Sequence, residues 1–202
     1  MRDTYAETKF SILQAGRRLI AQKGFTGVGL NELLAAADIP KGSFYHYFGS
    51  KERYGRELIE QYVDEYLQRL DKSFSADGQS DTTARERLLT YWGYWLETQC
   101  CEIAEHKCLV VKLSAEVADL SDDMRVALHT GTEAFIARIA EAIRTGVAEG
   151  SLHTVLEPYR TAQMLYQQWL GASLLSRLSR DRAPMEAAML VTRRVLVLPE
   201  AG

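Results

Sequence analysis

Residues 29–48, which read GLNELLAAADIPKGSFYHYF, decide the fold of this chain. The first nine residues of this stretch are rich in Leu and Ala and predict a short helix. This helix has to end before Pro40, which disfavours helical geometry in the residue that precedes it. A second short helix is predicted after the turn, with Phe44 and Phe48 on one face because they are four residues apart. The stretch therefore predicts two helices held at a fixed angle by a tight turn.

The opposite face of the second helix carries polar and aromatic side chains, namely Lys41, Ser43, Tyr45, His46 and Tyr47. A helix-turn-helix offers its second helix, N-terminus first, to the major groove of DNA. Gly42 and Ser43 are small enough for a close approach to bases or phosphates, and lysine, tyrosine and histidine can donate to phosphate oxygens. The alternative is that the tyrosines are merely packed in a helical bundle. So many rings in a row cannot all face inward from one short helix, which favours DNA binding.

The charge distribution agrees with a DNA-binding segment at the N-terminus. The 202 residues carry a net charge of −3, which by itself argues against a partner made of phosphates. Residues 1–56, however, contain nine Lys and Arg against five Asp and Glu, so their net charge is +4, and the remaining residues have a net charge of −7. The sequence therefore predicts a basic binding module on an acidic body.

The rest of the chain predicts helices and no strands. Only four prolines occur in the chain, and good helix formers dominate its composition. The expected helices cover about residues 4–23, 29–37, 41–48, 51–73, 83–104, 108–118, 121–149, 158–179 and 184–198. The expected fold is all-α, with a helix-turn-helix DNA-binding domain at 1–50, a connecting helix at 51–73 and a C-terminal effector-sensing and dimerisation domain at 74–202.

Three short segments near the N-terminus form a signature: Gly24-Phe25, the run KGSFYHYF at 41–48, and Ser50-Lys51-Glu52. Through them, residues 6 to about 60 resemble the TetR family of transcriptional regulators. The resemblance implies a repressor that binds double-stranded operator DNA as a homodimer. Position by position, it implies that Asn31, Lys41, Gly42 and Ser43 face bases or nearby phosphates, and that Tyr45, His46, Tyr47 and Lys51 hold the DNA backbone.

Three segments of the C-terminal half point to a narrower group: CLVVKLSAEV at 108–117, DLSDDMR at 119–125 and WLGA at 169–172. They resemble those TetR-family repressors that respond to N-ethylmaleimide and control the detoxification of reactive electrophiles and oxidants. The resemblance implies that Cys108 is the redox or electrophile sensor. Ala118 stands where that group has a further cysteine, so a disulfide at that position is impossible here.

The surroundings of Cys108 also bear on its reactivity. It follows His106 and Lys107, precedes Lys112 by one helical turn and begins a predicted helix, and each of these features raises the thiolate fraction of a cysteine. The alternative is a small core residue, as free cysteines often are. The residues alone leave both interpretations open, and the resemblance favours the sensor. Cys100 and Cys101 are either partners in sensing or bystanders in the core.

A competing hypothesis is a pocket for an apolar effector that binds without a covalent bond. The residues proposed as its walls are Trp92, Trp95, Phe135, Met164 and Trp169. Aromatic residues at helical spacing more often form an ordinary core, and a pocket also needs a few well-placed polar groups.

The last two helices predict the dimer interface. The residues proposed for it are Leu165, Trp169, Ala172 and Leu175 in one helix and Met189, Val191, Val195 and Leu198 in the other. The alternative is that they pack within their own chain. A two-fold dimer would place its two recognition helices about 34 Å apart on a palindromic operator.

Several other classes of protein are not expected. The histidines stand in unrelated contexts, and no catalytic triad, paired carboxylates or glycine-rich phosphate loop is present, so an enzyme is disfavoured. The cysteine spacing is not a zinc pattern, and neither a metal nor a cofactor is expected. No apolar run approaches the roughly 20 residues of a membrane helix, and no signal-peptide pattern occurs, which favours a cytoplasmic protein. A helical interaction module without DNA binding remains as an alternative.

Overall fold

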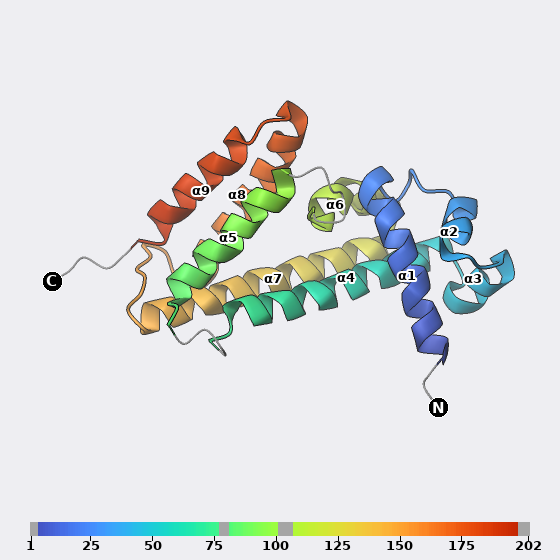
Figure 1. The fold of residues 1–202 in the computed structure, drawn as a ribbon, viewed down its shortest axis with the longest axis horizontal. Coiled ribbons are helices and arrows are strands. Elements are labelled where there is room, and N and C mark those ends of the chain that lie inside the picture. The colour runs from blue at the N-terminus through green and yellow to red at the C-terminus, as the bar shows by residue number, and fades with distance from the viewer. Residues whose placement is uncertain (1–3, 77–80, 101–106, 198–202) are drawn as a thin grey trace. The chain divides into compact units, whose positions relative to one another are not determined.

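The computed structural model describes residues 4–76, 81–100 and 107–197, and these ranges are helical apart from their connecting turns (Figure 1). The helices are α1 (Thr4–Lys23), α2 (Leu30–Ala37), α3 (Lys41–Phe48), α4 (Lys51–Phe74), α5 (Ala84–Cys100), α6 (Leu109–Leu120), α7 (Asp122–Ala148), α8 (Pro158–Ser179) and α9 (Ala183–Val195). An isolated antiparallel bridge joins His153 to Val197. The all-α prediction is confirmed. Two predicted helix ends, at residues 104 and 198, lie outside the described ranges. Within these ranges, no helix combines the length and apolar character needed to cross a bilayer.

Most helix ends lie within a few residues of the predicted ones because local capping groups set them. The hydroxyl of Ser50, just before α4, accepts a hydrogen bond from the backbone N–H of Arg53 at 3.1 Å. At the start of α5, the side chains of Thr83 and Glu86 accept reciprocally from each other's backbone N–H, at 3.2 and 2.7 Å. The carboxylate of Glu157 caps α8. Such signals lie within one turn of chain and can be read from sequence.

The chain forms two compact units. Unit 1 comprises Met1–Asp64 and Ile103–Gly131, and unit 2 comprises Glu65–Glu102 and Thr132–Gly202. The long helices α4 and α7 each contribute one segment to each unit. The sequence-based division at residues 50 and 73 follows the order of the chain, whereas α6 groups with the N-terminal helices in unit 1.

Three aromatic rings hold α3 in place within unit 1. Phe44 and Phe48 are fully buried, with ring centroids 5.2 Å apart. The ring of Tyr54 in α4 completes the cluster at 5.3 Å from Phe44 and 4.9 Å from Phe48. The Tyr54 hydroxyl donates to the carbonyl of Ile12 in α1 at 3.4 Å, and burial raises the pKa of this hydroxyl above its usual range. Tyr54 thus links α1 and α4 to the buried face of α3, and α2 lies beside α3 (Figure 1).

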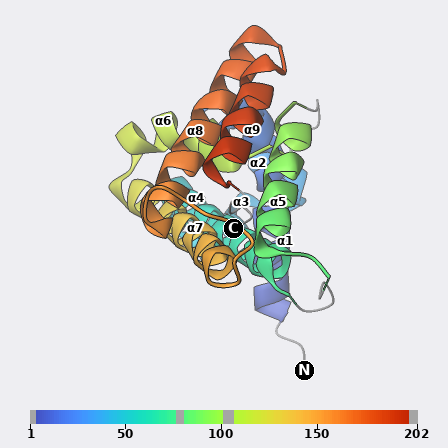
Figure 2. The ribbon, with the colours of Figure 1, turned by 90° about the vertical axis from the view of Figure 1, so that its left-hand side faces the viewer.

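Unit 2 is built around three tryptophans. Trp92 of α5 and Trp169 of α8 stack with centroids 4.9 Å apart and an interplanar angle of 11°, and both are fully buried. Trp95 meets both rings edge-on, and its indole N–H donates to the hydroxyl of Tyr66 in α4 at 2.9 Å. The indole N–H of Trp169 donates to Thr192 of α9 at 2.9 Å. These contacts join α5, α8 and α9, and the last two run side by side (Figure 2).

Candidate nucleic-acid interface and cysteine site

The predicted contact residues of α3 lie at its outward face. The exposed ones are Lys41, Gly42, Tyr45 and His46, and the half-buried ones are Ser43 and Tyr47. The ammonium of Lys41 lies 6.0 Å from the centre of the Tyr45 ring. Asn31 is exposed on the neighbouring α2. The face opposite the buried Phe44 and Phe48 therefore presents hydrogen-bond donors beside a helix N-terminus, an arrangement suited to phosphate.

Tyr5, which the sequence reasoning missed, packs against this face. Its ring lies 4.7 Å from the ring of Tyr47 and 6.1 Å from that of His46, although 45% of the residue stays exposed. The first turn of α1 thus braces the aromatic side of α3. Nothing near Tyr5 in the sequence signals this contact, because it joins residues far apart in the chain.

Lys51 makes an intramolecular contact. Its ammonium donates to the carbonyl of Phe25 at 3.1 Å and lies 4.8 Å from the centre of the Phe25 ring. Phe25 is buried in the loop between α1 and α2. Lys51 therefore fastens this loop to the first turn of α4. The bond to Phe25 uses one of the three ammonium N–H donors, so the contact with the DNA backbone remains a prediction.

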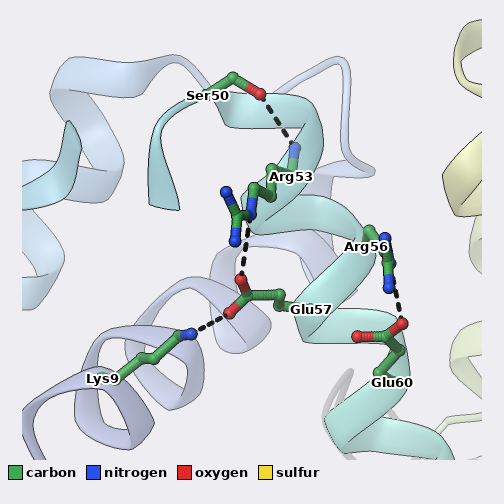
Figure 3. Close-up of polar contacts among 6 residues, drawn as sticks. All are labelled: Lys9, Ser50, Arg53, Arg56, Glu57 and Glu60. Carbon is green, nitrogen blue, oxygen red and sulfur yellow. Dashed lines mark hydrogen bonds and ion pairs between the residues drawn. The ribbon is translucent and has the colours of Figure 1, made fainter. Parts of the chain in front are cut away.

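An ion pair joins α1 to α4, and two further pairs lie within the first turns of α4 (Figure 3). Glu57 lies 2.6 Å from the ammonium of Lys9 and 3.6 Å from the guanidinium of Arg53, and Arg56 pairs with Glu60 at 2.8 Å. These side chains border a polar cleft of about 450 Å³ between the two helices. Part of the positive charge counted in residues 1–56 is thus offset by acids in unit 1.

Cys108 is the residue immediately before α6 and is not in a disulfide. It is buried, with 4% of its surface exposed, and its Sγ lies 3.6 Å from the hydroxyl of Tyr62 in α4. The same hydroxyl accepts a hydrogen bond from the backbone N–H of Leu109 at 3.3 Å, and the guanidinium of Arg17 in α1 lies 5.2 Å from the centre of the Tyr62 ring. Tyr62, which sequence reasoning missed, thus connects Cys108 to both α1 and α4.

Cys101 and the side chain of Cys100 lie outside the described residues. In the part of the chain that the structure describes, no group of three or more His, Cys, Asp and Glu side chains is arranged to hold a metal ion.

The predicted pocket residues come together only in part. Trp92, Trp95 and Trp169 pack on one another as described above, and the fully buried Phe135 lies 4.4 Å from the ring of Tyr66. Met164, by contrast, is 37% exposed on α8. The buried indole N–H of Trp92 has no hydrogen-bond partner among the described residues.

The predicted dimer face of α8 is partly wrong. Leu165 and Trp169 are fully buried and Ala172 is 7% exposed within a single chain, so the core of unit 2 already occupies them. A second stripe of α8 points outward, with its members at helical spacing: Met164, Gly171, Leu175 and Leu178. Leu190 and Val191 are exposed on α9. Leu175 and Val191 are thus predicted interface residues that do lie on the surface, and the predicted Leu198 lies outside the described residues.

Comparison with known proteins gives matches along most of the chain. Residues 12–53 match the family model for bacterial regulatory proteins of the tetR family, and residues 84–191 match that for the tetracyclin repressor-like C-terminal domain. The chain is 40% identical over 196 residues to the HTH-type transcriptional repressor NemR of Escherichia coli strain K12, with 97% of both chains covered. It is 36% identical over 177 residues to the transcriptional regulator AcuR of Cereibacter sphaeroides, covering 88% of this chain and 80% of that one. The crystal structure of E. coli NemR in its reduced form matches with a TM-score of 0.89 and 40% identity, covering 96% of this chain and 100% of that one.

Proposed function

Because the chain belongs to the TetR family and is a DNA-binding transcriptional repressor of that type rather than an enzyme, we propose that reactive electrophiles or oxidants release it from its operator by modifying Cys108. One observation carries the proposal: Cys108 adjoins Tyr62 of α4, and only two residues separate α4 from the recognition helix α3. A change at the sulfur therefore acts directly on a helix of unit 1, the unit that contains the helix-turn-helix and is thus the DNA-binding unit.

The roles proposed for DNA contact follow from exposure and position. Lys41, Gly42 and Ser43 form the first turn of α3, the part of a recognition helix that meets base edges, and Asn31 extends this surface from α2. The residues that would hold phosphates are Tyr45, His46, Tyr47 and Lys51. Membership of the TetR family excludes the alternative of a helical module that does not bind DNA.

TetR regulators typically act as dimers, and the outward stripes of α8 and α9 are our proposed interface. Gly171 leaves room for a close approach between helices, and Leu175 and Leu178, which are 56% and 74% exposed, supply apolar surface. A two-fold dimer would present its two copies of α3 about one helical turn of DNA, ~34 Å, apart. The operator is therefore expected to be a palindrome.

The chemistry at Cys108 can be written out for N-ethylmaleimide. The sulfur forms a bond to one carbon of the electron-poor double bond, and the thiol proton ends on the neighbouring carbon, so no further reactant is required. Hydrogen peroxide would instead transfer one oxygen to the same sulfur, which converts the thiol to a sulfenic acid and releases the rest of the peroxide as water. The added group needs space, while Cys108 is 4% exposed in a closely packed core. Tyr62 or the start of α6 must move to accommodate it.

The proposal is tested by measuring operator affinity with and without N-ethylmaleimide for the wild type and for Cys108→Ser. We expect modification to weaken binding by the wild type at least about tenfold, a change of about 1.4 kcal/mol, and to leave Cys108→Ser almost unaffected. The matched control is Cys100→Ser with Cys101→Ser, which should respond like the wild type. An equal loss of affinity in Cys108→Ser would remove Cys108 from the mechanism.

Release by an apolar effector is a second candidate, and the buried Trp92 indole N–H favours it, because a ligand oxygen could satisfy this donor. In that case a chemically inert aromatic compound that carries an acceptor oxygen would release Cys108→Ser as readily as the wild type. Trp92→Phe, which keeps the apolar ring but lacks the donor, would then lose the response. If no inert compound releases Cys108→Ser, this second candidate fails.

A further inference from the structure

A carboxylate on α6 holds the loop between α1 and α2. The Oε2 atom of Glu116 accepts hydrogen bonds from the backbone N–H of Thr26 at 3.0 Å and from its hydroxyl at 3.1 Å. Gly24 has a positive φ of 82°, and a Cβ at this position would overlap the Oε1 atom of Glu116. The end of α1 is therefore shaped around this carboxylate, since a larger residue at Gly24 would displace it.

The loop that Glu116 holds is also part of the DNA-binding unit. Its Phe25 is buried under the ammonium of Lys51, which donates to the Phe25 carbonyl. A Cβ at Gly55 of α4 would collide with the Phe25 ring, so the loop lies close against α4. Thr26, Phe25 and the first turns of α4 are thus mechanically connected, and α3 directly precedes α4 in the chain.

The other end of α6 is the cysteine site. Cys108 and the N–H of Leu109 both contact the hydroxyl of Tyr62, at 3.6 and 3.3 Å. Glu116 lies eight residues after Cys108, about 12 Å further along the helix. The buried residues between them, Leu109, Val110 and Leu113, fix α6 as a packed helix. The rigid helix α6 therefore has the sulfur of Cys108 at its start and Glu116 near its end. The hydrogen bonds from Thr26 to Glu116 form a polar tie between α6 and the loop that joins α1 to α2.

We propose that Glu116 is a positioning residue that couples the Cys108 end of α6 to the DNA-binding helices through Thr26. This inference rests on the proposed function of Cys108. On this proposal, the contact between Glu116 and Thr26 belongs to the DNA-binding arrangement of the unmodified protein. A group added at Cys108 displaces α6 and moves the carboxylate of Glu116 away from Thr26. The loop between α1 and α2, which Lys51 holds against α4, is then released.

The experiment compares Glu116→Ala with Glu116→Gln. Both changes remove one negative charge, so long-range repulsion from DNA changes equally, but the glutamine side-chain oxygen can still accept both hydrogen bonds from Thr26. We expect Glu116→Ala to weaken operator binding by the unmodified protein about tenfold and Glu116→Gln to stay within about twofold of the wild type. Asp119→Ala, an exposed acid on the same helix, is the matched control and should bind like the wild type.

The same variants are then treated with N-ethylmaleimide. Glu116→Ala should lose less further affinity on modification than the wild type, because its tie is already broken, while Glu116→Gln should respond fully. The melting temperature of each unmodified variant shows whether a loss of affinity comes from the missing contact with Thr26 or from a misfolded protein.

Equal affinity of Glu116→Ala and Glu116→Gln before modification would overturn the coupling, even if Cys108 proves to be the sensor. If the wild type itself is not released by modification, the function proposed for Cys108 fails and so does its coupling through α6. In that case a tenfold difference between the two Glu116 variants would still identify a tie that supports DNA binding.

Discussion

The hydroxyl of Tyr54 occupies the space beside Gly16, where α1 meets α4. A Cβ on Gly16 would overlap this hydroxyl and come within 2.8 Å of the Leu33 side chain in α2. Gly42 in α3 is the opposite case, because a Cβ there would meet nothing within 4 Å. The two glycines therefore serve different purposes at the scale of single residues: Gly16 allows the DNA-binding unit to pack, and Gly42 leaves its surface open.

This contrast gives a first prediction. Gly16→Ala should lower the free energy of unfolding by about 1–3 kcal/mol, because the added methyl group overpacks the contact with Tyr54. Gly42→Ala should leave that free energy unchanged or raise it by up to ~1 kcal/mol, as expected for a helix position, yet weaken operator binding by blocking the approach to DNA. Urea unfolding and operator titration of both variants provide the check. Equal stability of the two variants would contradict the packing argument.

The contact between Lys51 and Phe25 sharpens a second prediction. Lys51→Ala should weaken binding to all DNA sequences and reduce the slope of log affinity against log salt by about one, if its ammonium also meets a phosphate. It should in addition destabilise the protein by about 1 kcal/mol, because the Phe25 carbonyl loses its donor. Lys41→Ala, in contrast, should alter sequence preference. A changed preference in Lys51→Ala with an unchanged salt slope would reverse these roles.

At the scale of elements, helix ends were easier to predict than helix faces. Ser50, Thr83 and Pro158 set the starts of their helices through groups within one turn of chain, so their signals are local. In α8, apolar residues occur on two faces, and helical spacing alone does not say which face turns inward. The structure buries Trp169 in the core and exposes Leu178, because α5 and α9 cover only one side of the helix.

The start of α5 gives a third prediction, on pH. A hydrogen bond with Ser151 and one from the Ala84 N–H hold the pKa of the Glu149 carboxyl below its ordinary value of 4.5, and the ionised form therefore stabilises the folded protein. This contribution is present above that ordinary value and is lost as the pH falls through the lowered pKa of the folded state. Glu149→Gln should thus be less stable than the wild type at neutral pH, and the difference should shrink in acid. Urea unfolding across this pH range is the measurement. Glu141→Gln, which changes an exposed acid of α7, the helix that ends just before Glu149, should show a small difference at every pH.

At the scale of the whole molecule, DNA binding depends on assembly and charge. The net charge of −3 conceals a basic N-terminal segment, although Arg53 and Arg56 are partly neutralised by Glu57 and Glu60. The positive charge that reaches a phosphate is thus smaller than the count for residues 1–56 suggests. In the dimer that we propose, two copies of the interface on one operator would compensate for this, since both half-sites would contribute to affinity.

The outward stripe of α8 supplies a fourth prediction. Leu175→Asp with Leu178→Asp should convert the dimer to a monomer, because the interface would have to bury two unpaired charges. Operator affinity should fall by at least about 100-fold, since one half-site is lost. Light scattering coupled to size-exclusion chromatography measures the assembly. Val155→Asp, which changes an apolar residue that is 94% exposed outside α8 and α9, should remain dimeric. A dimer that survives both changes in α8 would place the interface elsewhere.

Local signals in the sequence were sufficient to predict the two short helices, the turn at Pro40 and the outward donors of α3, because caps, proline and four-residue spacing act over a few residues. The sequence also pointed to Cys108 through the likeness to a family. The packing of the folded chain, by contrast, brings Cys108 to Tyr62, places Glu116 against Thr26 and turns Trp169 inward. These contacts join residues 23 to 90 positions apart in the chain. They depend on which helix faces pack together, and no local pattern specifies that choice.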